Sequence, residues 1–69
     1  MTRVWRSPEG EKLSCVEKIK VLEENLAELR QLAQDALEDA VLMGGDERQL
    51  REALHEIVDD LKNPYAKKT

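Results

Sequence analysis

An unbroken run from Ser14 to Met43 contains neither Gly nor Pro and is rich in Leu, Ala, Glu, Lys and Gln, which are strong helix formers. Its apolar residues recur every three or four positions, which places them on one face of a helix. This feature commits the chain to one long amphipathic helix. In a chain of 69 residues, it leaves room for little more than one further helix.

The signals that follow this run predict a tight turn and a shorter second helix. Gly44 and Gly45 break the first helix, and Asp46 is a favourable cap for the next, with Gln49 at the capping-box position. Pro64 ends the second helix, because the residue before a proline avoids helical geometry. We therefore expect an N-terminal arm over 1–13 with an optional helical turn from residue 8, a helix over 14–43, a turn over 44–46, a helix over 47–62 and a basic tail over 63–69.

A short connection between two helices with apolar stripes is typical of an antiparallel hairpin, so the expected fold class is all-α. The predicted helices span roughly 45 and 24 Å at 1.5 Å per residue, so the second reaches only part of the first. The expected core within the hairpin comprises Leu32, Ala33, Ala36, Leu37, Ala40, Met43, Leu50, Leu54, Ile57 and Leu61. The second helix covers the first down to about Leu29, and the apolar residues beyond that reach are Cys15, Val16, Ile19, Leu22 and Leu26. Together with Leu29 they form the expected dimer interface.

These uncovered residues predict self-association. Five apolar side chains at about 1.5–3 kcal/mol each for full burial are costly to leave in water. The simplest cover is a second copy crossing antiparallel about a two-fold axis, which gives a homodimeric four-helix bundle. In the alternative, Trp5 and the tail around Tyr65 fold back over the same residues in a monomer.

The composition argues against catalysis and against a resident cofactor or metal. One Cys excludes an internal disulfide, and one Cys with one His excludes a structural zinc site. Glu52 and His55 have the Glu-x-x-His spacing of di-iron bundles, but the predicted frame places both toward solvent. Cys15 falls on the apolar seam, which predicts a buried, inert thiol; a redox role or a crosslink between chains is the alternative.

The charges predict the kind of partner. Residues 13–61 carry thirteen acidic and five basic side chains, whereas both ends are basic. An acidic body repels nucleic acid, so a protein partner is expected, with the cytoplasm as the compartment because the lone Cys and the absence of an apolar leader or transmembrane run fit it. The acidic runs and the terminal segments are the candidate contacts. In those segments the candidates are Arg3, Trp5, Arg6, Tyr65, Lys67 and Lys68.

The segment Leu50–Leu61, with its apolar-x-Glu-small-Leu-His-acid opening and Asp-acid-Leu close, is similar to the second helix of the Rop-type hairpins. The resemblance implies a homodimeric antiparallel four-helix bundle. It also implies an alternative function, the binding of structured RNA, here through the basic ends of the dimer. Rop-type proteins use basic residues and a Phe on their first helix for this purpose, whereas this chain contains no Phe.

Overall fold

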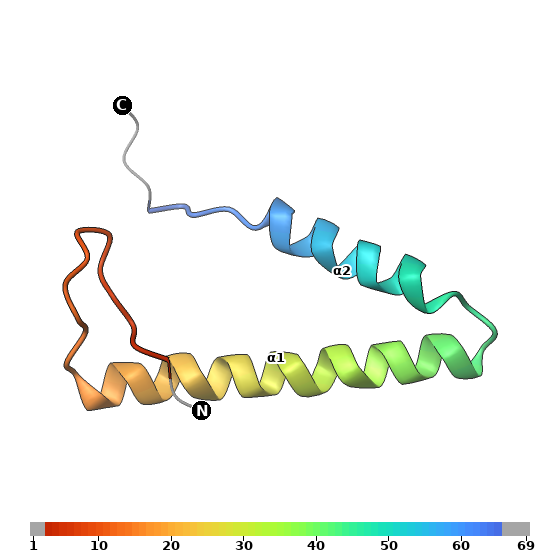
Figure 1. Ribbon diagram of the computed structural model, residues 1–69, viewed down its shortest axis with the longest axis horizontal. Helices are drawn as coiled ribbons and strands as arrows, with labels where there is room; N and C mark the ends of the chain where they lie inside the picture. The colour runs from red at the N-terminus through yellow and green to blue at the C-terminus, as the bar shows by residue number, and fades with distance from the viewer. Residues whose placement is uncertain (1–2, 66–69) are drawn as a thin grey trace. The chain divides into compact units, whose positions relative to one another are not determined.

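The computed structural model describes residues 3–65, and its regular elements are two helices. Helix α1 spans Val16–Leu42 and α2 spans Glu47–Asp60, which correspond to lengths of about 40 and 21 Å at 1.5 Å per residue (Figure 1). Two compact units divide between Leu32 and Ala33, within α1. Within the described range, neither helix is long and apolar enough to cross a bilayer.

Residues 5–13 of the arm form a short antiparallel hairpin instead of the optional helical turn from Pro8. Arg6 and Lys12 are bridge partners, and the Leu13 amide donates to the Trp5 carbonyl at 2.9 Å. The two halves of this hairpin are joined by a β-turn over residues 7–10, in which the Gly10 amide donates to the Ser7 carbonyl at 2.9 Å. Pro8 occupies the second position of the turn, where its fixed backbone angle is favourable. The expectation of a helical turn was wrong because this sequence satisfies its backbone groups across the hairpin.

The start of α1 lies two residues after the expected start at Ser14. The Cys15 carbonyl accepts the first helical hydrogen bond, from the Ile19 amide at 3.1 Å, so Cys15 occupies the capping position. Because Leu13 is held extended by its bond to Trp5, the chain enters the helix only after the hairpin closes.

The two glycines at the end of α1 have different roles. Gly44 has φ +88°, a left-handed conformation that glycine adopts without steric cost. The Gly45 amide donates to the Ala40 carbonyl at 2.7 Å, and a side chain at Gly45 would place its Cβ 3.0 Å from that oxygen. Together with the Gly44 bond to Val41 at 3.1 Å, this arrangement is a Schellman motif, which ends α1 one residue before Met43.

Helix α2 begins at a side-chain cap and ends at a backbone cap, in which the Leu61 amide donates to the Val58 carbonyl. The Asp46 carboxylate accepts the Arg48 amide at 2.8 Å, which confirms Asp46 as the N-cap. The expected end at residue 62 was two residues too late: Leu61 is extended, and beyond it the Asn63 side chain accepts the Tyr65 amide at 2.8 Å across Pro64. An asparagine before proline favours this local turn over a further helical turn.

Within the C-terminal unit, the glycine turn reverses the chain to give a two-helix hairpin (Figure 1). Its half-buried apolar residues come from both helices at helical spacing, with three alanines and one leucine on α1 and two leucines and one alanine on α2. They are Ala33, Ala36, Leu37, Ala40, Leu50, Ala53 and Leu54. No residue in 3–65 is fully buried, so this contact is a thin layer rather than a closed core.

Candidate interaction surface

The arm contacts α1 through one cluster of three side chains. The Trp5 indole Nε1 donates to Glu23 Oε1 at 3.2 Å, and Arg3 Nε lies 3.9 Å from the same oxygen. The Arg3 guanidinium also lies 5.5 Å from the centroid of the Trp5 ring, within the range of a cation–π contact. Trp5 is half-buried in consequence, and Glu23 is the residue of α1 that fixes the arm.

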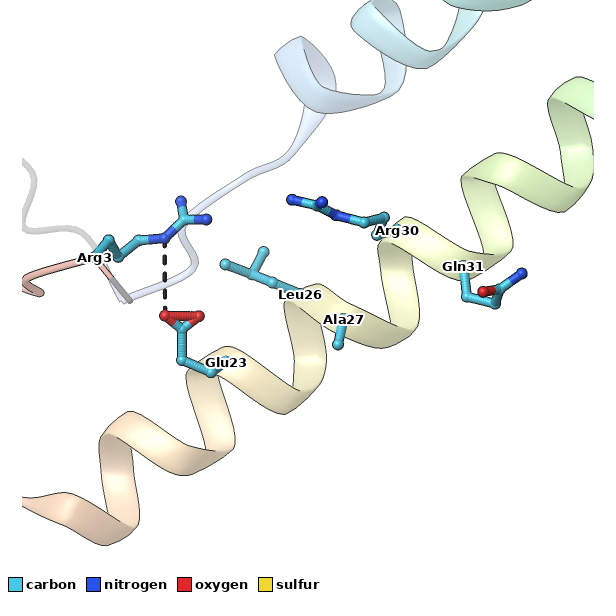
Figure 2. Close-up of a pocket in the computed structure, with 6 residues that line it drawn as sticks. All are labelled: Arg3, Glu23, Leu26, Ala27, Arg30 and Gln31. Atoms are coloured by element: carbon cyan, nitrogen blue, oxygen red, sulfur yellow. Dashed lines mark ion pairs between the residues drawn. The ribbon is translucent and has the colours of Figure 1, made fainter. Parts of the chain in front are cut away.

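Figure 2 shows this contact at the edge of an open hollow along α1. Arg3 and Glu23 face each other across it, and Leu26 and Arg30 project from the next turns of the helix. The hollow is open to solvent, and two guanidinium groups and one carboxylate make its lining polar. It is the rim of the arm contact rather than an enclosed site for a small molecule.

The residues predicted as a dimer interface divide into two groups. Ile19, Leu22 and Leu26 are half-buried in the unit that contains the arm, and we call them the α1 stripe. The residues toward the two ends of the predicted interface, Cys15 and Val16 at one end and Leu29 at the other, are exposed, Leu29 at 60% of its surface. In the monomer alternative, Trp5 and the tail around Tyr65 both fold back over the apolar residues of the long helix. Trp5 does contact α1, whereas Tyr65 is 91% exposed.

The residues predicted as the hairpin core also divide. In the single chain the half-buried layer excludes four of the predicted core residues, which remain exposed. They are Leu32, Met43, Ile57 and Leu61. Met43 follows the last residue of α1 and Leu61 the last residue of α2, so both lie where the helical stripe has ended. Ile57 and Val58, also exposed, continue the apolar face of α2 beyond its covered half.

Cys15 is exposed at the start of α1 in the single chain, and its expected burial between two copies stays a prediction. The heptad position of Cys15 is apolar, but the residue lies at the cap, before the helix provides a face. His55 and Glu52 are exposed, and no group of three His, Cys, Asp or Glu side chains within residues 3–65 is arranged to hold a metal ion.

Acidic side chains occupy the C-terminal turns of both helices, where a negative charge is unfavourable for the helix. Asp39 lies in the last turn of α1, and Asp59 and Asp60 lie in the last turn of α2, while neither turn contains a basic residue. The C-terminal end of a helix carries a partial negative charge, so each carboxylate there costs about 0.3–1 kcal/mol rather than stabilising the fold. Asp59 and Asp60 are exposed and adjoin the exposed Ile57 and Val58.

The candidate partner contacts are therefore distributed unevenly. Arg3 and Trp5 contact α1, and the Arg6 guanidinium donates to the Gly10 carbonyl at 3.0 Å within the arm hairpin. Lys67 and Lys68 lie outside the described residues. Sequence reasoning missed Glu23, whose signal was its position beside the apolar seam together with a Ser-Pro-x-Gly turn that returns the arm toward the helix.

Comparison of the chain with protein-family models, with curated proteins and with solved structures gives no match.

Proposed function

We propose that this chain is a non-catalytic interaction protein of the cytoplasm that pairs with a second copy and binds a protein partner through its acidic surface. The pair would be an antiparallel four-helix bundle similar to those of Rop-type hairpins. The observation that carries the proposal is the lack of any fully buried residue in 3–65, together with exposed apolar side chains on both helices. A chain of this size needs additional burial to be stable, and a second copy supplies it.

Helix lengths give independent support for the pairing. Helix α2 has 14 residues, and an isolated helix of that length is marginal in water. Its outer half carries the exposed Ile57 and Val58, so half of its apolar face does not contribute to its own stability in the single chain. Pairing would bury Leu29 of α1 and this part of α2 at once, which couples folding to association.

We expect purified protein to be dimeric by light scattering and largely helical by circular dichroism. On dilution below the dimer dissociation constant, the helical signal should fall along with the molar mass, because folding and association are coupled. The measurement is a concentration series by both methods. A folded monomer whose helicity is unchanged over the series would contradict the proposal.

The acidic surface supports a basic protein as the partner. Helix α1 carries seven acidic and three basic side chains, and α2 carries five acidic and two basic. The acidic pair Asp59–Asp60 is unfavourable for its own helix and lies beside exposed apolar side chains, a combination suited to a basic, partly apolar surface. Phosphate backbones would be repelled by the same charges, which disfavours the RNA alternative.

Replacing Asp59 and Asp60 by Asn should abolish retention of a basic partner captured from the source cells. It should also leave α2 as stable or more stable by about 0.3–1 kcal/mol, because two charges are removed from a helix C-terminus. Replacing Glu9 and Glu11 of the arm by Gln is the matched control, and it removes the same number of charges. Equal capture by both variants, or retention of structured RNA at low salt instead of protein, would overturn the assignment.

A further inference from the structure

The arm lies on the surface that the proposed dimer requires. Trp5 and Arg3 converge on Glu23, the residue that follows Leu22 of the α1 stripe. Ile19, Leu22 and Leu26 are half-buried in this unit, whereas Leu29, one turn beyond the stripe, is exposed. The arm and a second copy therefore need the same part of α1.

We propose that the arm is an intramolecular strap that competes with the second copy for the α1 stripe, so that the chain limits its own self-association. This inference rests on the proposed function. The closed form has the Trp5 indole bound to Glu23, and the open form frees the stripe for the partner copy. The contact observed in the single chain is the closed form.

The strap has more hydrogen bonds within itself than to α1. Among the described residues, five hold the arm in its hairpin: the Leu13 amide to the Trp5 carbonyl, the Ser7 amide to the Glu11 carbonyl, the Gly10 amide to the Ser7 carbonyl, the Glu11 amide to the Ser7 hydroxyl, and the Arg6 guanidinium to the Gly10 carbonyl. Among the described residues, the polar contacts of the strap with α1 include one hydrogen bond of 3.2 Å from Trp5 and one ion pair of 3.9 Å from Arg3, both to Glu23. The side chains of the ion pair are 57% exposed for Arg3 and 30% for Glu23. Each contact of this kind shifts the equilibrium between the closed and open forms by only a few-fold. The strap can therefore detach from α1 when a second copy binds.

Mass action determines the size of the effect. If the closed form outweighs the open form by about fivefold, opening the strap of one chain raises the dimer dissociation constant by about that factor. Two chains open when a dimer forms, so the factor applies twice. Removal of the strap contact should therefore tighten the dimer by roughly tenfold or more. The direction matters more than the size, because loss of an ordinary interface residue weakens association.

The experiment compares full-length Trp5→Ala with Tyr65→Ala, in which the other aromatic residue of the chain, 91% exposed, is removed. Sedimentation equilibrium should give a dissociation constant about tenfold or more lower for Trp5→Ala and an unchanged value for Tyr65→Ala. Glu23→Gln should tighten the dimer to a smaller extent, because the amide oxygen still accepts from the indole while the attraction to Arg3 is lost. Glu24→Gln, at the next position, is its control.

Trp5 is the only tryptophan in the sequence, so its fluorescence reports on the strap directly. We expect its emission to shift to longer wavelength as protein concentration rises, because dimer formation releases the indole into water. A dimer that is weakened by Trp5→Ala would mean that the arm is exchanged between copies, and an unchanged dimer would mean that it has no role in pairing. Either result overturns the strap and leaves the dimer intact, whereas monomers at every concentration in every variant would overturn the proposed function itself.

Discussion

Leu29→Glu should weaken self-association by at least about 100-fold. Leu29 lies within the predicted interface, and a carboxylate buried there without a partner costs about 3–5 kcal/mol in each copy. The side chain is 60% exposed in the single chain, so the substitution places the new charge in water until the copies pair. Association measured by sedimentation equilibrium should therefore change far more than the helicity of the free chain.

Val21→Glu is the matched control for this substitution. Val21 is also an apolar residue of α1, 55% exposed, but it lies outside the predicted heptad seam. The substitution introduces the same charge and removes a similar amount of apolar surface. Equal weakening by the two variants would show that the predicted frame is wrong and that a broader face of α1 is buried between copies.

Thiol crosslinking should identify the antiparallel arrangement by an all-or-none result. If the interface from Cys15 to Leu29 is symmetric about Leu22, the two Cys15 residues of a dimer are separated by roughly 21 Å along the helices. A short bismaleimide should therefore leave the wild-type protein uncrosslinked. Leu22→Cys in a Cys15→Ser background should crosslink efficiently, because residues near a two-fold axis meet their own counterparts.

The Cys15 thiol is exposed in the single chain, and its labelling by a monofunctional maleimide in the dimer is the control that makes the negative result informative. Both proteins crosslinking would indicate parallel chains, in which every residue meets its counterpart. Failure of both to crosslink at a concentration where the protein is dimeric would place the interface elsewhere, for example on the exposed outer half of α2.

Local chemistry explains which parts of the fold could be predicted. The helix breaks were readable because each depends on adjacent residues: Gly44 and Gly45 form the Schellman motif, and Asp46 caps α2. Periodicity likewise identified the facing stripes, of which Ala33, Ala40, Leu50 and Leu54 are half-buried in the C-terminal unit. Boundaries were less accurate, because the bond from Leu13 to Trp5 and the turn at Asn63 hold the flanking residues outside the helices.

Two helices of unequal length, the turn between them and an apolar stripe along each helix were predictable from the sequence, because spacing and breaker residues act over a few positions. The three-dimensional fold alone establishes that the arm forms a hairpin and that Trp5 contacts Glu23, eighteen positions along the chain. It also decided that Cys15 is exposed and that Ile57 and Leu61 extend beyond the covered layer. These features depend on which segments meet in space, and such long-range contacts leave no periodic trace in the sequence.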